Sequence, residues 1–506
     1  MKKIILVTLF LGALFRFFIT ADGNFYFNMD NARDMVDVRE MVVLGHLRLI
    51  GQTTSIDGIY YGPGWYYLLT IPFILSGGHP YAPILMEITF WILGGFFLLY
   101  LAYKFYGTWA YVAVTCFWVA SNFILLGSQY AFNPNPILFL TPIFIYCLWR
   151  FVESGKWWFA TVSWFLAGAF LHFEVTVGLF MPLVIVLVIF LTKKSLFKTR
   201  SFYLAVLVFG LTLLPQLLFE LRHNFFMTKA LLSYQSTSHS MVSGSLIEKA
   251  ADIFKGFYNT LLPTFMNFKL FTNIVIIIFT LVVLKLLRNT KKLDIVTLIT
   301  LLLIFVPLLG LIPLKVGILP WYFNASLVAS ILAVGLVFYH LKTHFGKIVA
   351  VILVLVLVVF SVQNIHEYIK AAQRKSLGNS HLRTELSAID YVYQQAGGKN
   401  FKVYTYLPSV YDWPYQYLFW WHGLKKYGYL PQEYAYAPNK PPYVPSKEKL
   451  EVGNQPESSG LVFLIKEPDQ TGIRHLWENQ FKNLELLKSE NIGPLTIEVR
   501  NELPLF

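Results

Sequence analysis

Repeated apolar segments constrain this chain more than any other feature of its sequence. About eleven runs approach or exceed the roughly 18–20 residues that a helix needs to cross the hydrocarbon core of a bilayer. With charged residues at only 14% and a mean hydropathy of +0.55, these runs predict a polytopic α-helical membrane protein. We place the spans at residues 4–20, 80–103, 107–127, 134–152, 157–172, 175–192, 202–220, 271–287, 295–313, 321–340 and 347–363. The alternative for the fifth and sixth spans is a single re-entrant hairpin.

The formal charge of +13 reflects membrane topology rather than nucleic-acid binding. Residues 364–506 carry 16 basic and 15 acidic side chains, so the basic excess lies in the membrane part. There it gathers in short connections at alternate span ends, whereas the opposite short connections hold only Lys315. Because cytoplasmic loops are enriched in Lys and Arg, we expect a cytoplasmic N-terminus and an extracytoplasmic C-terminal domain in a plasma (inner) membrane. Membrane lipids are expected partners and nucleic acid is not.

The polar stretches divide the chain into two expected domains. Residues 1–363 form a transmembrane domain with two long external loops, 21–79 and 221–270. Residues 364–506 form a soluble extracytoplasmic domain. Its sequence has a helical pattern at 382–395 and alternating, strand-like patterns at 401–406, 461–465 and 495–499, which predict a small α/β fold.

The first external loop holds a cluster of acidic residues in a chain that is poor in acids. Of the 28 Asp and Glu residues, six lie between residues 22 and 57, whereas the other seven among the first 363 residues are scattered singly. The pattern of residues 28–45 is typical of a short helix, with Asn28 as a candidate N-cap and Gly45 as the stop signal.

On that helix Asp30, Asp34 and Asp37 share one face. Carboxylates placed in this way repel each other unless they share a cation, a metal or a proton, or unless they take part in catalysis. A solvated face on an interfacial helix is the alternative interpretation. In acid-poor surroundings we favour the functional one, with Asp30 as a natural general base because it lies nearest the outer end of the first span.

Further ionisable residues lie within spans or at their outer ends. Arg16 and Glu87 fall inside spans, where charged groups are candidates for function by default, although a structural pair between them is an equal alternative. His172 and Glu174 flank a tight external turn and have the chemistry of metal ligands. One histidine with one carboxylate makes a poor metal site, so contact with a substrate is the preferred interpretation.

Three short motifs carry a resemblance to a known family. The first is Asp30-Asn31 in the external loop, where the family commonly has Asp-Glu. The second is Pro63-Gly64-Trp65-Tyr66-Tyr67, where the family has Pro-Pro-Leu-x-Tyr-Tyr, and the third is Pro320-Trp321-Tyr322, which lacks the family's arginine. Together with the topology of residues 1 to about 365, they resemble the C-type membrane glycosyltransferases, and most closely the dolichyl-phosphate-mannose–protein mannosyltransferase and aminoarabinose transferase group.

This resemblance implies an enzyme that moves a sugar from a polyprenyl-phosphate carrier to a hydroxyl of a protein, lipid or glycan acceptor at the outer membrane face. Asp30 would be the general base, and Asp34 a second carboxylate or a metal ligand; whether a divalent metal takes part is left open. Candidate substrate-binding residues are Arg33, Tyr61, Glu87, His172, Glu174 and Arg222. A transporter or flippase of lipid-linked or small substrates is the alternative, although the two halves show no matching Gly/Pro-broken spans.

Overall fold

The computed structural model describes residues 1–236, 245–288, 293–314, 316–438, 444, 447–450, 455–469 and 471–502. Lys315, which entered the charge argument, lies outside these residues, as does part of the second external loop. The chain forms two units, each made of separate segments. The first contains Met1–Arg16, Arg48–Leu68 and Leu85–Tyr368, and the second contains Phe17–Leu47, Leu69–Ile84 and Ile369–Phe506.

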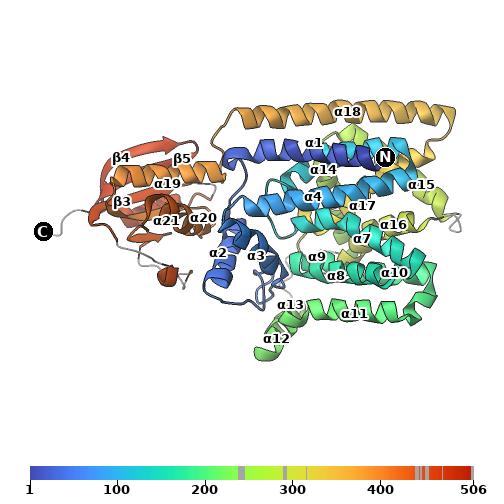
Figure 1. Ribbon diagram of the computed structural model, residues 1–506, viewed down its shortest axis with the longest axis horizontal. Helices are drawn as coiled ribbons and strands as arrows, with labels where there is room; N and C mark the ends of the chain where they lie inside the picture. Colours follow the sequence, from blue (N-terminus) through green and yellow to red (C-terminus); the bar gives the residue numbers. More distant parts are fainter. Residues whose placement is uncertain are drawn as a thin grey trace. The chain divides into compact units, whose positions relative to one another are not determined.

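The first unit is built from apolar helices, some of which extend into the second (Figure 1). The helices are α1 (Lys2–Thr20), α4 (Ala82–Leu101), α5 (Thr108–Ala120), α6 (Asn122–Gly127), α7 (Asn135–Ser154), α8 (Trp157–Phe173), α9 (Val175–Gly178), α10 (Phe180–Thr192), α11 (Arg200–Thr212), α12 (Leu214–Arg222), α13 (Phe226–Ser236), α14 (Leu246–Thr264), α15 (Lys269–Leu287), α16 (Ile295–Leu311), α17 (Asn324–His340) and α18 (His344–Gln373). Short helical turns at η2 (Ala102–Tyr106), η3 (Lys194–Lys198) and η5 (Pro320–Phe323) join some of them.

These helices confirm the predicted polytopic helical fold. By length and composition, 7 helices of the described chain can cross a membrane, or 8 if α11 and α12, bent by 49°, form one span. Four shorter apolar helices are α3 (Gly64–Ser76), α5, α8 and α16. Every predicted span coincides with one of these helices or with a consecutive pair, whereas the total of eleven spans stays a prediction.

Helix α17 lies at the centre of the first unit. All of its residues from Asn324 to Phe338 are buried, and it packs against α5, α7, α15 and α16. Small residues such as Ala329, Ser330 and Gly335 allow this close approach, since a Cβ at Gly335 would lie only 2.8 Å from the ring of Tyr106.

The C-terminal part of the second unit is the small α/β fold that the sequence predicts (Figure 1). Its elements are α19 (Leu382–Ala396), β1 (Asn400–Tyr406), α20 (Trp413–Leu418), η6 (Phe419–Gly423), α21 (Leu424–Tyr427), β2 (Glu433–Ala435), η7 (Lys447–Leu450), β3 (Ser458–Lys466), α22 (Arg474–Glu478), η8 (Asn479–Phe481), β4 (Glu485–Ile492) and β5 (Leu495–Asn501). The predicted helix corresponds to α19, and the three predicted strands correspond to β1, β3 and β5. Strands β2 and β4 were not predicted, because β2 has only 3 residues and β4 is exposed along almost its whole length.

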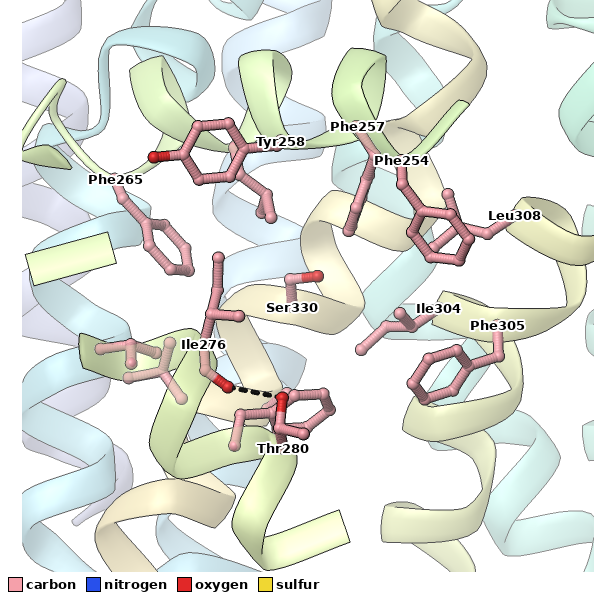
Figure 2. A pocket seen from close by; sticks show the side chains of 15 residues that line it. Phe254, Phe257, Tyr258, Phe265, Ile276, Thr280, Ile304, Phe305, Leu308 and Ser330 are labelled. Atoms are coloured by element: carbon pink, nitrogen blue, oxygen red, sulfur yellow. Dashed lines mark hydrogen bonds between the residues drawn. The ribbon is translucent and has the colours of Figure 1, made fainter. Parts of the chain in front are cut away.

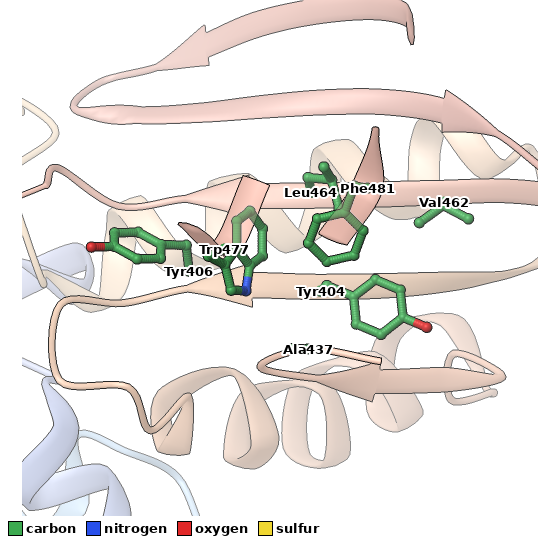
Figure 3. Close-up of a cluster of buried hydrophobic side chains, with 7 residues drawn as sticks. All are labelled: Tyr404, Tyr406, Ala437, Val462, Leu464, Trp477 and Phe481. Atoms are coloured by element: carbon green, nitrogen blue, oxygen red, sulfur yellow. The ribbon is translucent and has the colours of Figure 1, made fainter. Parts of the chain in front are cut away.

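The five strands form one mixed sheet in the order β2-β1-β3-β5-β4. Strand β1 pairs in parallel with β2 and β3, whereas β5 pairs antiparallel with β3 and β4. Because side chains alternate along a strand, Tyr404 and Tyr406 of β1 share a face with Val462 and Leu464 of β3. Figure 3 shows this face, on which Trp477 and Phe481 close the core together with Ala437.

Two acidic side chains of this fold, Glu385 and Glu467, are buried. Glu385 of α19 has both carboxylate oxygens buried and unpaired among the described residues. The Glu467 carboxylate follows β3 and lies 3.5 Å from the hydroxyl of Tyr415. Burial raises the pKa of Glu467 to about 7, and burial together with Glu467 raises the pKa of Glu385 well above its usual range.

Candidate functional site

The acidic segment forms a helix, α2 (Met29–Val43), as its sequence predicts. The Asn28 side chain accepts a hydrogen bond from the backbone N–H of Asp30 at 3.1 Å, which caps the first turn. Two residues beyond the helix Gly45 has a φ of +70°, a left-handed conformation that glycine adopts without a steric penalty. The predicted N-cap and stop signal are therefore confirmed.

Within α2 one arginine joins the two acids that we single out. The Nε and Nη2 atoms of Arg33 donate to Oδ1 of Asp34 at 3.0 and 2.9 Å. Nη1 of the same guanidinium donates to Oδ1 of Asp30 at 3.3 Å. The Asp34 side chain is 0% exposed, whereas that of Asp30 is 33% exposed.

Because they differ in exposure, the carboxylates of Asp30 and Asp34 suit different chemical roles. A general base must be reachable by the hydroxyl that it deprotonates, and only Asp30 presents its carboxylate to solvent. Asp34 is buried and held by the guanidinium, which suits it to orient Arg33. Because Arg33 also contacts Asp30, the three side chains form one connected cluster.

The opposite side of α2 is anchored in the C-terminal fold of the same unit. Helix α2 packs against α20. Arg39 is buried between them, with its Nη1 atom 3.5 Å from the backbone oxygen of Gln416 and its guanidinium carbon 5.2 Å from the centre of the Trp420 ring. Burial lowers the pKa of Arg39. Arg39 is not among the residues predicted from the sequence, although its basic side chain on the helix face opposite Asp30 and Asp34 is a signal that could have identified it.

A second polar cluster lies in the first unit. The hydroxyl of Tyr61 donates to Oε2 of Glu174 at 2.9 Å, and the N–H of Thr176 donates to Oε1 at 3.1 Å. The Trp321 side chain also hydrogen-bonds to this carboxylate. Burial raises the pKa of Glu174, and these hydrogen bonds counteract part of that rise. The structure thus brings together the predicted residues Tyr61 and Glu174.

His172 fixes the glycine-containing turn that follows Tyr61. Its Nδ1 atom accepts from the N–H of Gly64 at 3.2 Å, so Nε2 carries the proton and donates to the carbonyl of Thr212 at 2.7 Å. A Cβ at Gly62 would lie 1.8 Å from His172 Nδ1, and one at Gly64 would lie 2.8 Å from Cγ. Only glycine therefore allows the imidazole to approach both positions, and neither ring nitrogen has a lone pair left for a metal.

The remaining charged candidates lie apart from these clusters. Arg16 donates to backbone oxygens of Gly12, Trp118 and Val119, and its guanidinium carbon lies 3.6 Å from the centre of the Trp91 ring. Glu87 is 0% exposed, and neither of its oxygens accepts a hydrogen bond from the described residues. The alternative of an Arg16–Glu87 pair is therefore wrong, because the Nη atoms of Arg16 donate to backbone carbonyls instead. Arg222 is exposed at the end of α12.

No described residues form a group of three or more His, Cys, Asp or Glu side chains that suits a metal ion. The carboxylates of Asp30 and Asp34 are instead both in contact with the guanidinium of Arg33. The side chains present around Asp34 and His172 therefore do not fit a metal ligand set.

Two cavities flank helix α14 of the first unit. Figure 2 shows the first, of about 350 Å³, which lies among α14, α15, α16 and α17. Its walls are almost entirely apolar, with Phe254, Phe257, Phe265 and Leu308 pointing inward. The second, of about 540 Å³, lies among α6, α14 and η5, and both volumes fall in the range of roughly 300–1,000 Å³ typical of ligand pockets.

Comparison with known proteins identifies the fold. No protein-family model matches the chain, and no curated protein matches its sequence. The structure matches that of ArnT from Cupriavidus metallidurans bound to undecaprenyl phosphate, with a TM-score of 0.58 and 12% identity over 99% of this chain and 98% of that one. It also matches ArnT in the apo state, with a TM-score of 0.58 and 13% identity over 97% of each chain.

The chain therefore has the fold of ArnT, an aminoarabinose transferase of the C-type glycosyltransferase fold class. This confirms the resemblance that the motifs and topology of residues 1 to about 365 predict. The small C-terminal sheet domain, which was predicted separately from its helix and strand patterns, is also present.

Proposed function

We propose that this protein is a membrane glycosyltransferase that moves a sugar from a polyprenyl-phosphate carrier to an acceptor hydroxyl. The observation that carries the proposal is the shared fold, because a protein with that fold binds undecaprenyl phosphate and the match extends over 99% of this chain. Polyprenyl phosphate is also the leaving group that the sequence motifs imply. The fold and the sequence motifs therefore support the same donor.

Asp30 is the general base in this proposal. Its carboxylate takes the proton of the acceptor hydroxyl as that oxygen bonds to the anomeric carbon of the sugar. The bond from that carbon to the phosphate oxygen breaks at the same time, and polyprenyl phosphate leaves with the electron pair, which inverts the configuration. Arg33 and Asp34 hold Asp30 in place, since the guanidinium contacts both carboxylates.

The cavities of the first unit support a lipid-linked donor. The cavity in Figure 2 has few polar atoms in its walls and suits part of an isoprenoid chain. Arg222, at the exposed end of α12, has a charge that suits the phosphate. Glu174 and Tyr61 are proposed to contact the substrate as a hydrogen-bonded pair.

The test is the release of free polyprenyl phosphate by the purified protein in lipid, from a panel of polyprenyl-phosphate sugars and with membrane extract as the source of acceptors. We expect release by the wild type and a decrease of about 10²–10⁴ in kcat for Asp30→Asn, the usual contribution of a general base. Asp57→Asn, the same change at an exposed acid of the same loop, is the matched control. If the wild type releases no carrier from any donor, the protein is not this enzyme, and lipid-linked sugar transport becomes the hypothesis to examine.

A further inference from the structure

The larger cavity beside α14 differs in chemistry from the apolar one in Figure 2. Three amide side chains line it, from Asn135, Asn259 and Asn324, and the aromatic residues Tyr130 and Trp321 line it as well. None of the described residues that line it is charged. The cavity therefore offers hydrogen-bonding atoms and ring faces without a fixed charge.

The amide of Asn324 in this cavity has a hydrogen-bond acceptor that a ligand could use. The Nδ2 atom of Asn324 donates to the carbonyl of Pro134 at 2.8 Å, which fixes the side chain. Its Oδ1 atom accepts no hydrogen bond from the described residues, although the residue is only 1% exposed. An unpaired buried amide oxygen costs about 1–3 kcal/mol, so a donor supplied by a ligand would remove a cost that the protein otherwise carries.

Asn135 is also fixed through its amide nitrogen. Its Nδ2 atom donates to the backbone oxygens of Tyr130 and Gly127 at 2.6 and 3.4 Å. These bonds fix the orientation of the amide and of its Oδ1 acceptor. Two immobilised acceptors in one cavity are preorganised for a ligand that carries several hydroxyl groups.

The class of ligand follows from this lining. A sugar ring presents C–H groups that pack on aromatic faces and hydroxyls that donate to amide oxygens, and it needs both kinds of wall. A phosphate would need cations, and an amino sugar would need an acid to balance its ammonium group. A hydrocarbon chain would leave the buried oxygen of Asn324 unpaired, whereas the neighbouring apolar cavity accepts a chain without this penalty.

The cavity is also connected to the polar cluster of the first unit. Trp321 lines the cavity and its side chain hydrogen-bonds to Glu174, the carboxylate that accepts from Tyr61. A sugar that packs on Trp321 therefore contacts a side chain whose orientation depends on Glu174.

We infer that the cavity lined by Asn135, Asn259, Asn324 and Trp321 binds an uncharged sugar unit of the lipid-linked donor. This inference rests on the proposed function and narrows it to neutral sugars. It separates this chain from the aminoarabinose transferase whose fold it shares, because the described lining contains no acid to receive an ammonium group.

The experiment compares donors that share one polyprenyl-phosphate carrier and differ in the sugar: a neutral hexose, an amino sugar with a free ammonium group, and a uronic acid. The full-length protein in lipid should release carrier from the neutral donor with a kcat/KM at least about tenfold above that for either charged donor. Asn324→Asp places a negative charge in the cavity, so it should raise KM for the neutral donor about tenfold and lower it for the amino sugar. Asn224→Asp is the control, since this residue lies in an exposed turn with a left-handed φ of 54° that Asp also tolerates.

A second variant keeps the inference testable if Asn324→Asp does not fold. Asn259 is exposed at the rim of the cavity, so Asn259→Asp should fold as the wild type does and shift KM in the same direction by a smaller factor. A preference of the wild type for a charged donor, or an unchanged KM in both cavity variants, would overturn the inference while leaving the glycosyltransferase proposal intact. If no donor is turned over, the thermal stabilisation produced by each lipid-linked sugar tests the cavity alone. Equal stabilisation of wild type and Asn324→Asp by the neutral donor would then contradict the inference.

Discussion

Replacing Asp34 with Asn tests whether the two carboxylates of α2 have separate roles. Asp34 is 0% exposed and receives two hydrogen bonds from Arg33, at 3.0 and 2.9 Å. Hydrogen bonds to charged groups contribute about 1.5–3 kcal/mol, and neutral ones contribute roughly half as much. Because Arg33 is 19% exposed and water compensates part of the loss, we expect Asp34→Asn to lower the free energy of unfolding of the second unit by about 1–3 kcal/mol.

The assay combines thermal unfolding in lipid with the kinetics of carrier release. For a unit of this size a loss of 1 kcal/mol corresponds to roughly 2–4 °C in Tm, so a loss of about 1–3 kcal/mol should lower Tm by about 2–12 °C. We expect kcat to fall by about tenfold, less than for Asp30→Asn, because Arg33 keeps its contact with Asp30 at 3.3 Å. Asp30→Asn should leave Tm within about 2 °C of the wild type, since its side chain is 33% exposed. An unchanged Tm in Asp34→Asn, together with a loss of turnover as large as that of Asp30→Asn, would refute the division of roles.

Two further changes test the supporting structure. Gly62→Ala would place a Cβ 1.8 Å from Nδ1 of His172, so we expect the turn to shift and the turnover to fall at least tenfold in the release assay. Gly210→Ala is the control, because nothing lies within 4 Å of the added Cβ, and its turnover should equal that of the wild type. The folded-state pKa of Glu467, about 7, lies above that of the unfolded chain, so its contribution to stability is fully present below about pH 4.5 and is lost as pH rises through 7. Thermal melting between pH 4.5 and 8 should show a decrease of up to about 3 kcal/mol in the wild type, and Glu467→Gln should remove this part of the dependence.

Most of the helical architecture could be predicted because a membrane-spanning helix requires a long run of apolar residues. Each predicted span corresponds to a helix, since an apolar run of sufficient length has few alternatives to a helix in lipid. The acidic helix could be predicted equally well, because Asn28 and Gly45 are local signals whose effect does not depend on distant residues. Strand β4 was missed because it is exposed on the sheet edge and lacks the alternation that burial on one face imposes.

The pairing of side chains was harder to predict than the helices that carry them. The suggested Arg16–Glu87 pair fails because a guanidinium inside a helical bundle can bond to backbone carbonyls, which are present on every helix and leave no trace in the sequence. The link from Tyr61 through Glu174 to Trp321 joins residues from three distant parts of the chain. Only tertiary structure brings them together, and no local spacing predicts it.

The division of the chain into units indicates a structural role for the C-terminal fold. Residues Phe17–Leu47, which contain the acidic helix, belong to the same unit as residues after 369. Arg39 explains how this is achieved, because its buried guanidinium reaches the backbone of α20 and the ring of Trp420 from the helix that bears Asp30. A catalytic carboxylate must be held within fractions of an ångström, and a loop between two membrane spans has too few contacts to do this alone. The C-terminal fold therefore contributes to the proposed reaction as the support of α2, although it supplies none of the groups assigned to bond making.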